Sequence, residues 1–277
     1  MNFVTLTSDI GHQDYLVGAI KAQLLQVSND LTLVDISHNI SPFNFTQASY
    51  VCRGAFKNFP ELTFHIILVN LFDKKSEHLL LAFHKNQYII CADNGLLNMI
   101  LEETPDIIMA LPLPGNTPRN TLYYTKIMAD TIGRILNGES IQKIGIPDVP
   151  FHKKNPLQPI SNSDYVEGQI IFVDNFENVI VNITRKQFEE QQNGRRFKIM
   201  FKRDEVIDRI SETYADVPEG EKLALFNSAD YLEIAINKGN AAGLFGLKGF
   251  SNPDMSGQSS NILQSKLMYQ TVRITFE

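Results

Sequence analysis

The sequence predicts a mixed α/β protein with a largely parallel N-terminal sheet covered by helices and a smaller C-terminal antiparallel β-domain. Strand-like and helix-like segments alternate through the first half of the chain, a pattern typical of parallel sheets with helical crossovers. After about Asp148 prolines cluster, and strand-like runs then dominate. The length of 277 residues allows two domains. We expect them at 1–150 and 166–277, joined by a proline-rich linker at 151–165.

The N-terminal elements follow from the spacing of apolar residues. Short apolar runs predict strands at 3–7, 31–36, 63–69, 79–83, 88–91 and 106–111. Apolar residues at helical spacing predict helices at 15–27, 46–56, 96–101 and 124–136. Thr46 is expected to cap the second helix, because its hydroxyl can accept a hydrogen bond from a free backbone N–H.

The C-terminal part is rich in strands. Four prolines between positions 147 and 159 punctuate a polar stretch, which predicts an extended linker. Beyond it, strands are expected at 168–173, 179–183, 197–201, 222–226, 231–236 and 271–276, with a helix at 185–192. We interpret the polar residues within 226–235 as a bulge that interrupts a strand.

Charge and composition exclude several classes of function. The net charge of −6 and the pI near 5.6 argue against a surface for nucleic acid or an anionic membrane. No metal-binding spacing of Cys or His occurs, so no metal is expected. No signal peptide is expected, and no apolar run approaches the length of a membrane span. Cys52 and Cys91 lie in apolar contexts typical of buried free thiols, so we expect a cytoplasmic protein.

Short polar clusters follow the apolar runs at four places. They are Ser8-Asp9-Ile10-Gly11, Asp35-Ile36-Ser37-His38, Ala92-Asp93-Asn94-Gly95 and Asp174-Asn175-Phe176-Glu177-Asn178. Open α/β sheets place their ligand contacts just beyond the carboxyl ends of strands. The clusters therefore predict a polar small-molecule pocket, and the fourth lies so far along the chain that a second domain must help to build it.

Each N-terminal cluster allows two interpretations. Asp9 can accept hydrogen bonds from a ribose diol or can cap the following helix, and spacing alone leaves both open. Asp35 and His38 fit mutual fixing of a loop better than a charge relay, since no nucleophile is identifiable. Phe43 could stack on a purine or pack in the core. Asp93 precedes a tight Asn-Gly turn and could also face the same crevice as Asp9.

The C-terminal clusters are equally open. Asp174 and Asn178 bracket a turn that is either hairpin chemistry or a place for an amino-acid head group, with the carboxylate pairing with the ammonium. Two further stretches, one with Tyr214 and one with Asn227 and Ser228, combine polar and apolar residues. Each alone would be interpreted as a loop followed by a core strand.

Taken together, these stretches resemble the S-adenosylmethionine hydroxide adenosyltransferase family, relatives of the fluorinating and chlorinating enzymes. The resemblance covers nearly the whole chain and depends on the order and spacing of its short motifs. These are Thr7-Ser8-Asp9-Ile10-Gly11, Val34-Asp35-Ile36-Ser37-His38, Ala92-Asp93-Asn94-Gly95, Asp174 to Asn178, Thr213-Tyr214 and Tyr231-Leu232-Glu233-Ile234-Ala235.

The resemblance implies a homotrimer whose ligand lies between the N-terminal domain of one subunit and the C-terminal domain of the next. Asp9 would hold the ribose hydroxyls and Phe43 would lie near the sugar or base, while Asp174 and Asn178 would hold the methionine end. Side chains of the neighbouring subunit would line the other face, namely Tyr214, Asn227 and Ser228. S-adenosylmethionine would be the substrate or ligand, with no separate cofactor. In active members, water attacks the ribose 5′ carbon and expels methionine.

This chain departs from the family where the chemistry occurs. The family's hydrolytic members place an Asp, an Arg and a His around the attacking water, and here these positions become Asn70, Glu77 and Tyr123. A neutral amide cannot act as a base, and a glutamate supplies no positive charge. The glycine of the family's Asp-Arg-Phe-Gly-Asn stretch is also replaced, by Glu177.

Three interpretations follow from these departures. The chain is an S-adenosylmethionine hydrolase with a substituted catalytic set, a non-catalytic binder of S-adenosylmethionine or adenosine, or a structural trimer. The substituted set would be drawn from Asn70, Asp73, Glu77, His78 and Tyr123. Adenosine release, ligand binding without turnover, or neither would distinguish the three.

Overall fold

The structure is a computed structural model that describes residues 2–75, 77–115, 118–202, 205–247 and 270–277. The chain forms two compact units, Met1–Pro156 and Leu157–Glu277. The expected change from an alternating α/β pattern to a β-rich pattern is therefore also a change from one unit to the next.

The N-terminal unit is built on one mixed sheet with the strand order β2-β1-β3-β5-β4-β6-β7. Its strands are β1 (Asn2–Ser8), β2 (Leu31–Ser37), β3 (Phe64–Leu68), β4 (His78–His84), β5 (Gln87–Ala92), β6 (Ile107–Pro112) and β7 (Ile146–Pro147). The sheet is parallel from β2 to β5 and antiparallel from β5 to β7. The expectation of a largely parallel sheet is therefore correct for one side of the sheet and wrong for the other.

The antiparallel side begins at a tight hairpin between β4 and β5. The two loop residues, Lys85 and Asn86, both have positive φ values, 47° and 57°. This is the backbone of the two-residue turns that match the twist of paired strands. Lys-Asn is a weaker signal for such a turn than Asn-Gly, so the reversal of strand direction was not predicted here.

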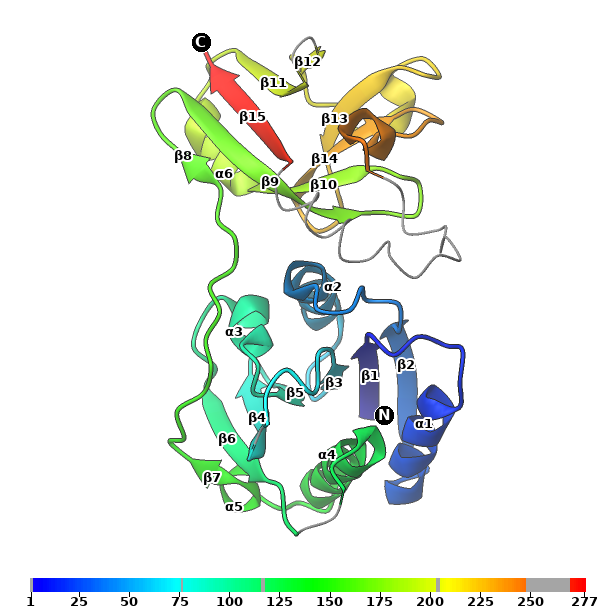
Figure 1. Cartoon of the computed structure of the whole chain (residues 1–277). Helices are drawn as coiled ribbons and strands as arrows, with labels where there is room; N and C mark the ends of the chain where they lie inside the picture. Colours follow the sequence, from blue (N-terminus) through cyan, green and yellow to red (C-terminus); the bar gives the residue numbers. More distant parts are fainter. Residues whose placement is uncertain (1, 76, 116–117, 203–204, 248–269) are drawn as a thin grey trace. The chain divides into compact units, whose positions relative to one another are not determined.

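Helices cover both faces of this sheet (Figure 1). They are α1 (Leu16–Val27), α2 (Phe45–Asn58), α3 (Leu96–Leu101), α4 (Thr121–Leu136) and α5 (Ile141–Ile144). The apolar sides of α1 and α4 pack with one face of the strands, and those of α2 and α3 pack with the other. Alternate strand residues serve the two layers, as Ile66 and Ile67 do, so the strands are buried on both sides.

The N-cap of α2 differs from the prediction. Asn44, and not Thr46, caps this helix, and its side-chain oxygen accepts a hydrogen bond from the backbone N–H of Gln47 at 3.0 Å. Thr46 already lies inside the first turn. Asn is as good a cap as Ser or Asp, and the cap lies two residues earlier than predicted.

The C-terminal unit is an antiparallel sheet with the order β12-β11-β15-β9-β10-β14-β13, and β8 pairs with β9 (Figure 1). Its strands are β8 (Ile160–Ser161), β9 (Tyr165–Val173), β10 (Val179–Thr184), β11 (Phe197–Lys202), β12 (Glu205–Ile207), β13 (Lys222–Phe226), β14 (Tyr231–Ile236) and β15 (Thr271–Phe276). The helix α6 (Arg185–Gln192) buries Phe188 among the rings of Phe197 and Phe226.

Residues 226–235 form a hairpin and not a bulged strand. Phe226 pairs with Leu232, and the chain turns between them. Asp230 takes a φ of 60° in this turn, which reverses the chain direction. The polar residues at 227–230 therefore connect two strands and do not interrupt one.

Candidate functional site

The strand order of the N-terminal sheet creates a topological switch point between β1 and β3. The chain leaves β1 through α1 to β2 on one side, and then crosses through α2 to β3 on the other side. The connections that follow two adjacent parallel strands then diverge, and a crevice opens at the carboxyl ends of those strands. Asp9 follows β1 and Asn70 lies just beyond β3, so both lie at this edge of the sheet.

Asp9 is fixed across this switch point. Its Oδ2 accepts a hydrogen bond from the backbone N–H of Asn70 at 2.8 Å. Burial raises the pKa of the Asp9 carboxyl, and backbone hydrogen bonds from Asn70 and from Asp9 itself oppose that rise. The N-cap residue of α1 is Tyr15, so Asp9 does not cap this helix. Of the two interpretations, capping is therefore wrong, and hydrogen bonding to a ribose diol stays a prediction.

A chain of polar contacts holds the loops beside Asp9. Ser8 Oγ lies 2.7 Å from His38 Nδ1, and His38 Nε2 lies 3.1 Å from Asp35 Oδ1. Asp35 Oδ2 in turn accepts from Lys21 Nζ at 2.6 Å. Ser8 and His38 have 0% and 1% of their surface exposed, so the serine cannot meet a substrate. This Ser-His-Asp arrangement ties the end of β1 to the end of β2 and keeps Asp9 in place.

Asn70 is held on both its backbone and its side chain. It takes a φ of 48°, a left-handed conformation that Asn tolerates better than most residues. Its Nδ2 donates to Asp73 Oδ1 at 3.0 Å, and its carbonyl accepts from Asn94 Nδ2 at 3.1 Å. Asn94 also donates to Val69 O at 3.0 Å, so its buried amide joins the ends of β3 and β5.

Asp93 is the centre of a second cluster at the same edge. This carboxylate is 7% exposed, and its Oδ1 accepts from the backbone N–H of His152 at 2.7 Å. Its Oδ2 lies 3.1 Å from His152 Nδ1 and 3.3 Å from His78 Nε2. Asp93 is thus enclosed by two imidazoles, one at the start of β4 and one from the residues predicted as a linker.

The three positions that sequence analysis predicts for the catalytic set lie in different surroundings. Asn70 is joined to Asp9, as described above. Glu77 is exposed, and its carbonyl accepts from the Leu113 N–H at 3.2 Å. Tyr123 donates its hydroxyl to the carbonyl of Pro114 at 2.5 Å. The Tyr123 hydroxyl is therefore engaged with backbone.

Phe43 lies apart from the core. Its side chain is 64% exposed, and its φ of 63° places it in a left-handed turn just before α2. A core staple is therefore the wrong interpretation for this residue.

In the C-terminal unit, Asp174 organises the turn between β9 and β10. Its Oδ1 accepts from the backbone N–H groups of Phe176 and Asn178 at 2.9 Å and 2.8 Å. Its Oδ2 accepts from Asn178 Nδ2 at 3.1 Å. Glu177 takes a φ of 63° in this turn, and its carbonyl accepts from the Ala242 N–H at 2.8 Å.

A buried carboxyl, Glu233 on β14, lies beside this turn. Tyr214 donates its hydroxyl to Glu233 Oε1 at 2.6 Å. Burial raises the pKa of the Glu233 carboxyl, the Tyr214 hydrogen bond lowers it, and the charge of Asp174 raises it further. Burial and the bond to Glu233 also raise the pKa of Tyr214. Sequence analysis counted Glu233 only as part of a motif, because an acid within an apolar strand gives no sign of its partners.

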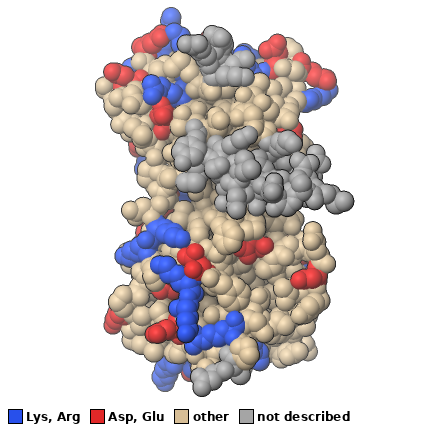
Figure 2. Space-filling view, viewed as in Figure 1, with Lys and Arg blue, Asp and Glu red and all other residues tan. Residues whose placement is uncertain are grey.

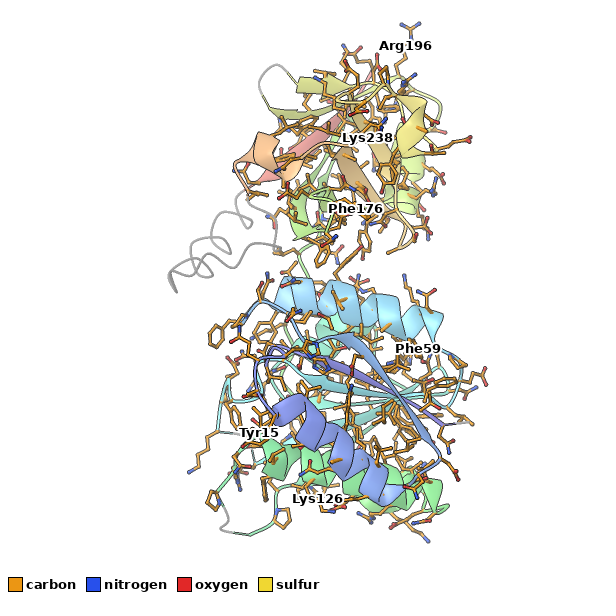
Figure 3. The ribbon with its side chains drawn as sticks, turned by 90° about the vertical axis from the view of Figure 1, so that its right-hand side faces the viewer. Tyr15, Phe59, Lys126, Phe176, Arg196 and Lys238 are labelled. Carbon is orange, nitrogen blue, oxygen red and sulfur yellow. The ribbon has the colours of Figure 1, made fainter. Side chains whose placement is uncertain are left out.

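A pocket of about 420 Å³ opens next to these groups. It is lined by Phe176, Asn178, Tyr214, Ile236, Lys238 and Gly239. Figure 3 labels Phe176 and Lys238 in this unit. Its lining thus combines aromatic, aliphatic and polar residues, and the ammonium of Lys238 is paired with Glu219 at 2.8 Å.

Asn227 and Ser228 lie at the β13–β14 turn. The Asn227 side-chain oxygen accepts from the N–H groups of Ala229 and Tyr231 at 2.9 Å and 3.2 Å. Ser228 is exposed in the same turn. Asn227 also bonds to Glu233, which connects the turn to the cluster around Tyr214.

Charge is distributed over both units. Figure 2 shows basic side chains of the N-terminal unit gathered in a band on the viewed face, with acidic ones beside it. Within the described ranges, no group of three or more His, Cys, Asp or Glu side chains could hold a metal ion. The helices of the described part include none that is long and apolar enough to cross a membrane.

The chain thus combines an α/β unit that has acidic and amide groups at its switch point with a β-unit that has a pocket of its own. Comparison with known proteins identifies the family. The profiles of the SAM hydroxide adenosyltransferase N-terminal and C-terminal domains match residues 4–145 and 168–252, and the chain belongs to this family.

Curated relatives agree over most of the length. An (R)-S-adenosyl-L-methionine hydrolase of Thermus thermophilus is 26% identical, covering 90% of this chain and 97% of that protein. The enzyme of the same name from Methanocaldococcus jannaschii is 23% identical, covering 88% and 92%. A fluorinase of Nocardia brasiliensis is 26% identical, covering 88% and 93%. An uncharacterized conserved protein from Thermotoga maritima shares the fold, with a TM-score of 0.78 at 24% identity, over 99% of this chain and 98% of that one.

Proposed function

We propose that this protein is an S-adenosylmethionine hydrolase with an altered catalytic set, producing adenosine and methionine. The observation that carries the proposal is the carboxylate of Asp9, fixed by the Asn70 N–H at the switch point and surrounded by other polar groups. Asp73 and His78 belong to the same edge of the sheet, and each can accept a proton. The named hydrolases among the relatives support the reaction type.

In the proposed binding mode, the edge that carries Asp9 binds the nucleoside part of the ligand and the Asp174 turn binds the methionine part. Asp9 accepts from the ribose hydroxyls, with Asp93 in the same crevice and Phe43 near the sugar or base. Asp174 and Asn178 hold the methionine end, because a carboxylate pairs with its ammonium and an amide with either group. Further contacts come from Tyr214, Asn227 and Ser228. The ligand is the substrate, and the proposal needs no separate cofactor.

The proposed reaction is a displacement by water. The water oxygen forms a bond to the ribose 5′ carbon while the bond from that carbon to sulfur breaks, and the electron pair stays on sulfur in methionine. One proton of the water passes to a base and then to solvent. Neither the neutral Asn70 amide nor the Tyr123 hydroxyl, which donates to backbone, suits that task. That leaves Asp73, Glu77 and His78, and of these Asp73 and His78 have side-chain contacts with other polar groups at this edge of the sheet.

A non-catalytic binder of S-adenosylmethionine or adenosine is the second candidate. It is favoured by one observation, that an amide stands at Asn70 and donates its hydrogen to Asp73. In that case the pocket would keep its ligand without activating water, since binding often survives the loss of acid–base groups.

One experiment separates the two candidates. Purified protein is incubated with S-adenosylmethionine, adenosine is followed by mass spectrometry, and the melting midpoint is recorded with and without ligand. A hydrolase releases adenosine with time. A binder raises the melting midpoint without release, because a ligand that prefers the native state stabilises it. If adenosine is not released and the melting midpoint does not change, both candidates are rejected.

We also propose a homotrimer in the cytoplasm. The trimer is what membership of this family suggests, and light scattering of the purified protein would test it. The cytoplasm is supported by Cys52 and Cys91, both buried as free thiols, which suits a reducing compartment. A monomeric mass would contradict the shared site.

A further inference from the structure

Residues 151–154, which sequence analysis assigned to the linker, are fastened to the carboxyl edge of the N-terminal sheet. We call them the docked segment. Phe151 packs against the apolar layer formed with α2 and α3. His152 binds Asp93 through both its backbone N–H and its ring. The carbonyl of Lys154 accepts from Asn98 Nδ2 at 2.9 Å. The segment is therefore held at its start, middle and end.

The docking places the side chain of Lys154 in a defined position. Its stem lies against Gly95, where an added Cβ would come within 2.5 Å of Lys154 Cγ. Gly95 also has a φ of 93°, so glycine is required here for two reasons. The ammonium lies 3.4 Å from the centre of the Phe45 ring and 3.7 Å from Asp73 Oδ2. A lysine on a free linker would not have this combination of contacts.

Lys154 completes a series of contacts that ends at Asp9. Asp73 Oδ2 faces the Lys154 ammonium at 3.7 Å, and Asp73 Oδ1 accepts from Asn70 Nδ2 at 3.0 Å. The backbone N–H of Asn70 then donates to Asp9 at 2.8 Å. Each oxygen of the Asp73 carboxylate thus has a different partner. Two partners on two oxygens fix the direction in which the carboxylate presents its remaining lone pairs.

We propose that Asp73 is the catalytic base of the hydrolysis and that Lys154, delivered by the docked segment, positions it. This inference rests on the proposed hydrolase function. Asp73 takes a proton from the attacking water as the water oxygen bonds to the 5′ carbon, and releases it to solvent after methionine leaves. The nearby ammonium also stabilises the negative charge that gathers on the water oxygen. The amide of Asn70 keeps a role, as a donor that orients the base.

The geometry favours Asp73 over His78 as the base. Asp73 is joined to Asp9 through the single residue Asn70. His78 instead contacts Asp93, whose other partner is His152 in the docked segment. The contacts of Asp93 therefore hold the docked segment, whereas Asp73 is linked by hydrogen bonds through Asn70 to Asp9, the proposed ribose site.

Steady-state hydrolysis tests the base. Asp73→Asn is expected to lower kcat by at least about 100-fold, the usual contribution of a positioned base, with KM little changed. His78→Gln is expected to lower kcat much less. The affinity for S-adenosylmethionine, measured by calorimetry, should stay the same in Asp73→Asn, which shows that the variant is folded and binds.

The positioning role has its own matched set of variants. Lys154→Met keeps the stem but removes the charge, and kcat is expected to fall about fivefold, a modest effect because the pair is partly exposed. Lys154→Arg restores most of the rate, since it restores the cation. Lys153→Met removes a charge from the neighbouring residue, whose ammonium lies 5.1 Å from the Phe151 ring, and should leave kcat unchanged.

The possible outcomes distinguish a failure of the Asp73 assignment from a failure of the proposed hydrolase function. Wild-type protein that releases no adenosine overturns the hydrolase and, with it, this assignment. Wild-type activity that survives in Asp73→Asn and is lost in His78→Gln overturns only the assignment and makes the histidine the base. Equal effects of Lys154→Met and Lys153→Met would reject the positioning role.

Discussion

The two polar sites of this chain are built over very different spans of sequence. In the C-terminal unit, Asp174 accepts hydrogen bonds from Phe176 and Asn178, so one turn holds itself together. In the N-terminal unit, Asp9 binds a residue 61 positions away and Asp93 one 59 positions away. A local turn keeps its geometry while its own residues are kept. A site built from distant segments changes when any one of them changes.

The resemblance in the sequence places the expected departures from the family unevenly between the two sites. At the N-terminal edge we expect Asn70, Glu77 and Tyr123 at the family's Asp, Arg and His positions, and the Asn70 amide donates to Asp73. In the C-terminal turn we expect Asp174 and Asn178 to be kept and only Glu177 to differ. We infer that the contacts proposed to hold the ligand are separate from those proposed to activate water.

The largest effect on ligand binding is expected from Asp9→Asn in the N-terminal site. Loss of its charge should weaken S-adenosylmethionine and adenosine alike by about 10- to 100-fold, because hydrogen bonds to a charged group contribute about 1.5–3 kcal/mol. Titration calorimetry measures both affinities. Asp30→Asn, in an exposed turn, serves as the control. Unchanged affinity in Asp9→Asn would reject the ribose assignment.

Asp174→Asn tests whether the C-terminal turn contacts only the methionine part of the ligand. The amide oxygen can still accept the two backbone bonds of the turn, so the fold should hold. S-adenosylmethionine is expected to bind about tenfold more weakly, since its ammonium loses a charged partner, while adenosine binds as before. The same calorimetric pair of ligands tests this. Equal loss for both ligands would mean that the turn does not hold the methionine end.

The same contrast explains what could be predicted from the sequence. Apolar periodicity located the main strands and helices, because burial on a sheet face or helix side repeats locally. Asp174 and Asn178 were predicted as a bracketed turn, since their partners lie within a few residues. The edge that carries Asp9 was predicted from the strand ends, following the general rule for α/β sheets.

The remainder depended on contacts that no local pattern carries. His152 and Lys154 lie in a proline-rich stretch, and only the fold brings them to Asp93 and Asp73. The antiparallel half of the first sheet depended on a Lys-Asn turn with two positive φ angles. Glu233 reads as one acid in an apolar strand until Tyr214 is seen to bind it.

A pH titration of stability tests how deeply the C-terminal cluster is buried. The pKa of Glu233 is raised in the folded protein above the ordinary value of 4.5, so the folded state holds this proton more tightly than the unfolded state. By linkage, its contribution to stability is complete below that value and is lost as the pH rises through the folded pKa. Urea unfolding of wild type should therefore show stability falling with pH in that window.

Glu233→Gln isolates that effect. The variant keeps an oxygen for the Tyr214 hydroxyl but cannot ionise, so its stability should fall less with rising pH. Asp9, whose pKa is also raised, contributes a slope of the same sign in both proteins, and the difference between the two curves belongs to Glu233. Parallel curves would mean that the carboxyl titrates as it does in the unfolded chain.

The smallest expected effect concerns Glu177 in the C-terminal turn. Glu177 has a φ of 63°, which costs a non-glycine residue of this kind about 1 kcal/mol, whereas glycine adopts it freely. Glu177→Gly should therefore raise the free energy of unfolding by about 0.5 kcal/mol, part of the gain being offset by the greater flexibility of unfolded glycine. Glu177→Ala, which removes the side chain but keeps the strained backbone, should give no such gain in a urea titration. If alanine stabilised as much as glycine, repulsion between the glutamate and Asp174 in the same turn would be the cause, and backbone strain would not limit the stability of this turn.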